Sequence, residues 1–172
     1  DNLTSLALAK ALVKKEIFVD LFYEKKNTKV DTTRTIGISK SNIDYFNREI
    51  SNIKKMLWPI KKIKIFTENS KDEEILKFED QKDNLFSILQ NQKIFNQLII
   101  ELKKSKFFKF KKYIKYRKSD YLSYDLIINC DIRNEITKRY FSKKFEKGYN
   151  STAFTTIINH IKLLFFESIY MN

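Results

Sequence analysis

The residues from Lys103 to Lys118 (KKSKFFKFKKYIKYRK) are the part of the sequence whose types and spacing best suit a chemical role. This stretch contains nine lysine or arginine residues and five aromatic rings, and it contains no carboxylate. Neighbouring cations repel each other, so a solvent-facing surface usually interleaves them with Asp and Glu. A row of uncompensated cations with rings between them suits a polyanion that offers both phosphates and flat bases. The stretch therefore predicts a contact with nucleic acid.

Within this stretch, the cations are predicted to bind phosphate and three of the rings are predicted to stack on unpaired bases. The predicted phosphate contacts are Lys103, Lys104, Lys106, Lys109, Lys111, Lys112, Lys115, Arg117 and Lys118, and the predicted stacking rings are Phe107, Tyr113 and Tyr116. An alternative stays open for the rings, because in an ordinary alternating strand they would point into the core while the lysines face water.

Two further basic groups are predicted to make secondary contacts. They are Lys61, Lys62 and Lys64, which follow Trp58-Pro59, and Lys138, Arg139, Lys143 and Lys144. Lysine acts on phosphate as a point charge rather than as a planar fork, so the excess of Lys over Arg favours recognition of shape and backbone. Three separate patches fit a protein embedded in folded RNA better than a reader of one DNA groove. A solvated surface is the alternative for both groups.

Carboxylates suggest a second chemistry, because basic proteins often cut the nucleic acid that they bind. Asp72, Asp80 and Lys82 resemble the residue types with which nucleases hold Mg²⁺ and support an attacking water. A second set comprises Asp125, Asp131, Glu135 and Lys138, although Glu135 and Lys138 are spaced for an ion pair on one helix face. A small metal-dependent nuclease is therefore an alternative function.

The composition narrows the function classes. The formal net charge is +13, with two glycines and one proline, which argues against glycine-rich phosphate loops and turn-dense β-sandwiches. Cys130 and His160 are the single residues of their types, so neither an internal disulfide nor a cysteine metal cage is expected. No apolar run has the ~18 residues that span a bilayer. We expect no cofactor and no small-molecule substrate.

The pattern of apolar residues predicts an α+β fold in one domain, residues 1–172, with 70–83 as the place where it would divide. The first part is predicted to contain a helix over 3–15, a hairpin from strands 17–23 and 28–39 with a bulge at Gly37, a helix from Ser41 to Pro59, and a strand over 60–66. Residues 71–83 are predicted to form a surface connection or a short helix. No internal repeat is visible.

The second part is predicted to begin with a helix from Asn84 to Leu102. The basic run over 103–118 fits a strand by its alternation at 108–111 and a helix by the spacing of Phe110, Tyr113, Ile114 and Arg117, and we favour a hairpin with a strand over 121–132. A cationic helix over 133–147 is predicted to end at Gly148 in a left-handed turn. A last helix starts at Ser151 or Thr152. In total we expect a mixed or antiparallel sheet of about four or five strands against three or four helices.

Together these features predict a structural RNA-binding protein of a ribonucleoprotein. Abundant Lys, Asn, Ile, Phe and Tyr indicate an A/T-rich genome, so we expect a ribosomal protein that binds rRNA and neighbouring proteins in a mitochondrion or another organelle. The chain starts at Asp1 and is expected to be a processed or partial product. A basic module that docks on an acidic protein or an anionic lipid surface is a further alternative.

Overall fold

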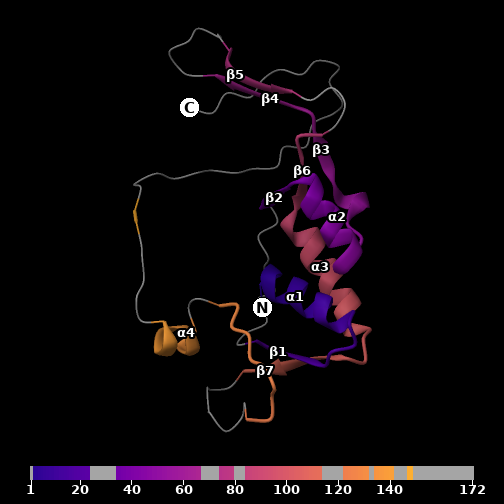
Figure 1. The fold of residues 1–172 in the computed structure, drawn as a ribbon, viewed down its shortest axis with the longest axis vertical. Coiled ribbons are helices and arrows are strands. Elements are labelled where there is room, and N and C mark those ends of the chain that lie inside the picture. Colours follow the sequence, from indigo (N-terminus) through magenta and orange to yellow (C-terminus); the bar gives the residue numbers. More distant parts are fainter. Residues whose placement is uncertain are drawn as a thin grey trace.

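The structure, a computed structural model, describes residues 2–23, 34–66, 74–79, 84–113, 122–131, 134–141 and 147–148. Its helices are α1 (Leu3–Val13), α2 (Lys40–Glu49), α3 (Asn91–Lys103) and α4 (Glu135–Tyr140), with a 3-10 turn, η1 (Lys54–Met56). Its strands are β1 (Val19–Tyr23), β2 (Thr35–Ile38), β3 (Trp58–Ile60), β4 (Lys62–Phe66), β5 (Glu74–Glu79), β6 (Phe86–Gln90) and β7 (Phe108–Lys112). The predicted α+β class is confirmed (Figure 1).

The described strands form three small sheets, each with fewer strands than the four or five expected. β1 and β7 form a parallel pair, β2, β6 and β3 form an antiparallel sheet with β6 in the centre, and β4 and β5 form an antiparallel hairpin. Figure 1 places the β4–β5 hairpin and the β1–β7 pair at opposite ends of the long axis, with α1, α2 and α3 between them.

The core lies where α1 and α3 pack against each other and against β1, β6 and β7. α1 begins at the cap residue Asn2, whose Oδ1 accepts a hydrogen bond from the Ser5 backbone N–H at 2.9 Å. Its buried residues recur at helical spacing, and so do those of α3. They are Leu6, Ala9 and Val13 on α1 and Ile94, Phe95, Leu98 and Leu102 on α3. The predicted helix over 3–15 is therefore present as α1.

The helix–turn–strand unit α1–β1 is matched by a second unit, α3–β7. Val19 pairs with Phe108, and every pair through Tyr23 and Lys112 keeps the same separation along the chain. The buried residues Leu6, Ala9 and Val13 of α1 correspond at that same separation to Phe95, Leu98 and Leu102 of α3. The two units thus form a structural repeat that the sequence alone did not reveal.

The predicted hairpin between residues 17–23 and 28–39 is wrong. β1 pairs with β7, and β2 pairs with β6, so Ile36 lies opposite Leu89. The reason is the buried face of β1, where Leu21 lies beside Phe110 of β7 against the core. The register of β2 and β6 continues without a shift through Gly37, so the predicted bulge is absent there.

α2 is shorter than predicted and begins earlier. Its cap is Ser39, whose Oγ accepts from the Asn42 N–H at 3.4 Å, and the helix ends at Glu49 instead of continuing to Pro59. The Asn47 side-chain oxygen accepts from the Ile53 N–H at 2.8 Å, which closes a turn after the helix. This turn lets both Ile50 and Ile53 reach the core, while Pro59 lies in β3.

Other predicted elements differ from the structure as well. Residues 74–79 form strand β5 rather than a connection or helix, and the helix expected from Asn84 is preceded by β6, so that α3 begins at Asn91. Described residues 122–131 form no regular strand, and β7 pairs with β1 instead. Gly148 has no left-handed backbone, and the last predicted helix lies outside the described residues.

Candidate nucleic-acid interface

The basic stretch is divided between the end of α3, a tight turn and β7. Lys103 is the last residue of α3 and Lys104 is its C-cap, where cations face the negative end of the helix dipole. Backbone hydrogen bonds from Lys104 to Glu101 and from Ser105 to Leu102 close the turn. Lys103, Lys104 and Lys106 are exposed and form no ion pair with any described residue.

On β7 Lys109 and Lys111 lie on the face opposite the rings of Phe108 and Phe110. Phe108 is buried and Phe110 packs against the core, whereas Lys109 and Lys111 are exposed on the other face together with Asp20 and Phe22 of β1. Lys112 is exposed at the end of the strand. The alternation therefore separates packing from charge, as in the ordinary-strand alternative for the rings.

The predicted stacking rings are half-buried where the structure describes them. Phe107 packs against the core and edge-on against Phe18, with ring centroids 5.0 Å apart. Tyr113 is half-buried, and its N–H donates to the Tyr23 carbonyl at 2.7 Å. Tyr116, Lys115, Arg117 and Lys118 lie outside the described residues.

Lys111 forms a polar cluster with Asp20 and Tyr124. Its Nζ lies 2.8 Å from Asp20 Oδ2 and 2.9 Å from the Tyr124 hydroxyl oxygen, and that hydroxyl donates to Asp20 Oδ2 at 2.5 Å. Partial burial alone would raise the pKa of Asp20, but the hydrogen bonds from Lys111 and Tyr124 and the charge of Lys111 outweigh it and lower that pKa. The hydrogen bond to Asp20 raises the pKa of Lys111. The cluster ties residues 122–131 to the β1–β7 pair, so Lys111 is less available for phosphate than Lys109.

The repeat of the two units brings a second lysine pair beside the first. Lys14 and Lys15 follow α1 as Lys103 and Lys104 end α3, and the two turns run side by side because the Val19 N–H donates to the Phe107 carbonyl at 2.8 Å. Figure 1 shows both turns at the same edge of the molecule, where α1 and α3 lead into β1 and β7. We name this edge the two-turn surface. It comprises Lys14, Lys15, Glu16, Ile17, Phe18, Lys103, Lys104, Lys106 and Phe107.

The two-turn surface holds one carboxylate, Glu16, among five lysines. Glu16 has a positive φ of 61°, which lets the chain turn sharply so that the Ile17 N–H reaches the Leu12 carbonyl at 3.2 Å. Lys14 Nζ donates to the Arg48 carbonyl, and after the hydrogen bond from Arg48 the charges of Lys15 and Lys14 also contribute to lowering the pKa of Glu49 at the end of α2. Sequence reasoning missed Lys14, Lys15 and Phe18. A repeated pattern in the sequence could have revealed them. In both units a Lys-Lys pair stands at the end of a helix, and the second lysine of the pair precedes a phenylalanine by three positions.

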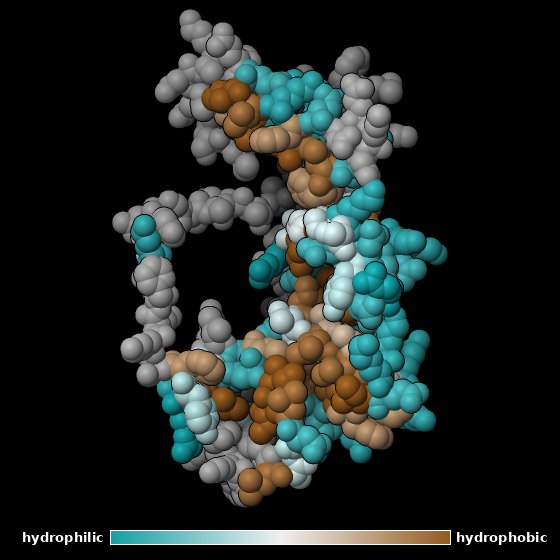
Figure 2. Space-filling model, in the orientation of Figure 1, coloured by the Kyte–Doolittle hydropathy of each residue, from teal (hydrophilic) through white to brown (hydrophobic). Residues whose placement is uncertain are grey.

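Two of the secondary lysines, by contrast, are paired with carboxylates. Lys64 lies 2.5 Å from Glu74 and Lys62 lies 4.0 Å from Glu79, across the β4–β5 hairpin, and Lys77 lies 2.5 Å from Glu79 on the same strand. Lys61 is exposed beside them. The opposite face of the hairpin carries Ile63, Ile65, Leu76 and Phe78. In Figure 2 this end of the molecule shows both hydrophobic and hydrophilic regions.

The remaining basic group is only partly described. Lys138 and Arg139 are exposed in the last turn of α4, and the Arg139 guanidinium lies over the Tyr140 ring at 5.9 Å. Lys143 and Lys144 lie outside the described residues. Figure 1 shows α4 well apart from the β4–β5 hairpin, so the three basic groups are not brought together.

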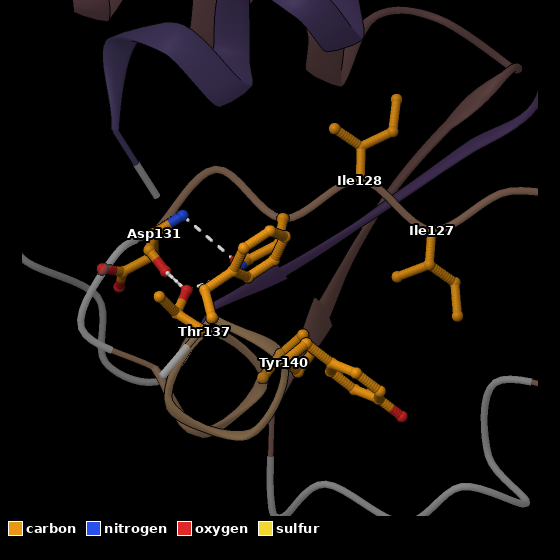
Figure 3. A pocket seen from close by; sticks show the side chains of 8 residues that line it. Ile127, Ile128, Asp131, Thr137 and Tyr140 are labelled. Carbon is orange, nitrogen blue, oxygen red and sulfur yellow. Dashed lines mark hydrogen bonds between the residues drawn. The ribbon is translucent and has the colours of Figure 1, made fainter. Parts of the chain in front are cut away.

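A groove of about 700 Å³ lies between residues 127–131 and α4 (Figure 3). Thr137 anchors its floor, because the Thr137 hydroxyl donates to the Asp131 carbonyl at 2.7 Å and accepts from Asn129 Nδ2 at 2.6 Å. Ile127, Ile128 and Tyr140 form its exposed walls. The described lining of the groove is mainly apolar.

The carboxylates considered for a nuclease do not converge where they are described. Asp72, Asp80 and Lys82 lie outside the described residues, and His160 does as well. Within the described part of the chain, no group of three or more His, Cys, Asp or Glu side chains could hold a metal ion, so Asp125, Asp131 and Glu135 form no such group.

Partial burial raises the pKa of the Cys130 thiol.

Comparison with known proteins adds no assignment. The chain matches no family model and no curated protein. Among the helices in the described ranges, none combines the length and the apolar character that crossing a membrane requires.

Proposed function

We propose that this protein is a structural RNA-binding component of a ribonucleoprotein and that the two-turn surface, with Lys109 and Lys112 of β7, contacts the RNA backbone. The observation that supports this most directly is the meeting of Lys14 and Lys15 with Lys103, Lys104 and Lys106 at one edge. These five lysines come from two distant parts of the chain, and Glu16 is the one carboxylate among them.

The proposed mechanism is charge neutralisation. Phosphates are closely spaced along RNA and hold condensed counterions, and each bound lysine releases part of that atmosphere. Lysines at the ends of α1 and α3 are held on rigid elements, so their ammonium groups follow a surface of fixed shape. Recognition would then depend on backbone geometry rather than on base edges, because these side chains are point charges.

We base the proposed kind of RNA on the composition of the chain. A net charge of +13 on 172 residues is a charge that an RNA-rich assembly neutralises, and the amino acids in excess are those with A/T-rich codons. On this proposal the chain is a ribosomal protein of an A/T-rich organelle that packs between rRNA and neighbouring proteins. Purification from the native source at low salt tests this point, since a specific rRNA should copurify.

The backbone contact is tested by the salt dependence of RNA binding. Replacing Lys103, Lys104 and Lys106 with Gln should weaken binding and flatten the plot of log affinity against log salt by about 2 units of slope. Fluorescence anisotropy with a labelled RNA over a series of KCl concentrations provides the measurement. An unchanged slope would show that these lysines do not meet phosphate.

The β4–β5 hairpin offers a control with the same change of charge. Replacing Lys62, Lys64 and Lys77 with Gln also removes three cations, but these lysines already pair with Glu74 and Glu79. We expect this variant to keep a salt slope close to that of the wild type. Equal flattening in both variants would indicate that net charge alone drives binding, and the assignment of the two-turn surface would be wrong.

A further inference from the structure

Phe18 is an exposed ring at the centre of the two-turn surface. It is 77% exposed, more than Phe141 at 69% or Trp58 at 67%, whereas Phe107, at the matching position of the second unit, is half-buried. Isolated apolar side chains on a surface need no special explanation. Phe18 differs because Lys14 and Lys15 precede it in the chain and because the ring that it contacts, Phe107, lies under the ammonium group of Lys106.

Hydrogen bonds of the neighbouring residues fix the backbone at Phe18. The backbone on either side is held, since the Ile17 N–H donates to the Leu12 carbonyl and the Val19 N–H donates to the Phe107 carbonyl. The rings of Phe18 and Phe107 meet at an interplanar angle of 65°. An edge-to-face contact of this kind occupies at most one face of each ring, so at least one face of Phe18 stays open to a flat partner.

A cation lies next to the ring that Phe18 contacts. Lys106 Nζ lies 5.0 Å from the centroid of Phe107, the ring that Phe18 touches. A base stacked on an aromatic ring carries its phosphate a few ångströms from the ring plane, where an ammonium group can neutralise it. The two parts of a nucleotide thus have neighbouring partners here, a π face for the base and a lysine for the phosphate.

We infer that Phe18 is a stacking platform for an unpaired base, so that the two-turn surface selects single-stranded or looped RNA over a continuous duplex. This inference rests on the proposed function and adds the class of RNA. A paired base cannot present its face to Phe18 without leaving the duplex, which costs free energy. Phosphate contacts alone would give no such preference.

The test compares two RNAs and three variants. The probes are an unstructured oligouridine and a fully paired RNA duplex of the same length, and the variants are Phe18→Leu, Phe18→Tyr and Phe141→Leu. Leucine keeps an apolar contact with Phe107 but has no π face, so Phe18→Leu should weaken oligouridine binding by about 5- to 100-fold. Its duplex binding and its salt slope should stay unchanged. Phe18→Tyr should restore oligouridine binding, and Phe141→Leu should leave it as in the wild type.

A second measurement does not depend on the variants folding. A 2-aminopurine base in a single-stranded probe loses fluorescence when it stacks on an aromatic ring, and it should be quenched when the wild-type protein binds. Equal oligouridine affinity in Phe18→Leu and wild type, or the absence of quenching on binding, would overturn the inference. The proposed function would survive either result, because it depends on the salt slope of the lysine variant.

Discussion

The Lys111 ammonium lies 2.8 Å from the Asp20 carboxylate, across the parallel strands β7 and β1. The same carboxylate oxygen accepts a hydrogen bond from Tyr124, so one acidic group of β1 binds both β7 and the segment 122–131, which lie much later in the sequence. Lys109 stands opposite Asp20 in the register and forms no ion pair with any described residue. Neighbouring lysines of one strand thus have different roles, one in the fold and one available to a ligand.

The Asp20 cluster predicts a loss of stability in acid. Because the folded state lowers the pKa of Asp20 below its ordinary value of 3.8, the ionised carboxylate stabilises the protein above that value. This contribution disappears as the pH falls through the folded-state pKa. Urea unfolding between pH 6 and pH 2.5 should give free energies of unfolding for wild type and Asp20→Asn that differ at pH 6 and converge in acid.

Asp44→Asn is the control for this experiment. Asp44 is an exposed carboxylate on α2 that forms no ion pair with any described residue. Its variant should follow the wild-type curve over the whole pH range. Parallel curves for Asp20→Asn and wild type, without convergence, would show that the Asp20 carboxylate gains nothing from Lys111 and Tyr124.

A polar network centred on Ser51 predicts a cost for removing one hydroxyl. Ser51 is buried, and its hydroxyl donates to Glu101 at 2.7 Å and accepts from Gln97 Nε2 at 2.6 Å, while Lys10 lies 3.0 Å from Glu101. Ser51→Ala removes one hydrogen bond from Glu101 and one from Gln97, which keep their other partners, so it should reduce the free energy of unfolding by about 1 kcal/mol. Chemical denaturation at pH 7 measures this change.

Ser41→Ala is the control for the prediction on Ser51→Ala. It is exposed near the start of α2, and Ser41→Ala should change the free energy of unfolding by less than about 0.5 kcal/mol. If both serine variants were equally stable, the network around Glu101 would contribute no net stability.

The Asn2 side chain makes two hydrogen bonds whose contributions to stability can be separated by substitution. Its Oδ1 caps α1 by accepting from the Ser5 N–H, and its Nδ2 donates to the Cys130 carbonyl at 2.7 Å. Asn2→Ala removes both contacts and should cost about 1–2 kcal/mol in the free energy of unfolding. Asn2→Asp keeps the cap but loses the donor to Cys130, so its cost should be smaller.

Hydrogen exchange distinguishes the two contacts of Asn2. In Asn2→Asp the amides of α1 should stay protected, while those near Cys130 should exchange faster than in the wild type. Faster exchange at the start of α1 in this variant would indicate that the aspartate does not replace the cap.

The sequence predicted α1 well and the strand pairing poorly, for one physical reason. A cap at Asn2 and apolar residues three and four positions apart are local signals, so they can be read without knowing the rest of the fold. The partner of β1 is a non-local choice, and the nearest strand along the chain was the wrong one. Leu21 packs beside Phe110, an apolar residue of β7 that lies much later in the sequence.

In the candidate site, too, some residues could be predicted from local sequence signals and others depend on non-local pairing. The exposed lysines Lys103, Lys104 and Lys106 could be found from their bunching, and the described part of the structure leaves them without carboxylate partners. Neutralisation of Lys64 by Glu74 could not be foreseen, because residues 74–79 were expected to be a connection or helix rather than the strand beside β4. The arrival of Lys15 next to Lys104 depends on the parallel pairing of β1 with β7, which sequence periodicity does not contain.

The parallel pairing of β1 with β7 also sets an order of events during translation. β1 leaves the ribosome first and then waits for about ninety more residues, which at typical elongation rates takes on the order of 5–20 seconds. Until then Val19, Leu21 and the apolar side of α1 have no final partner. The N-terminal segment of this protein therefore exposes apolar side chains during synthesis until β7 has been made.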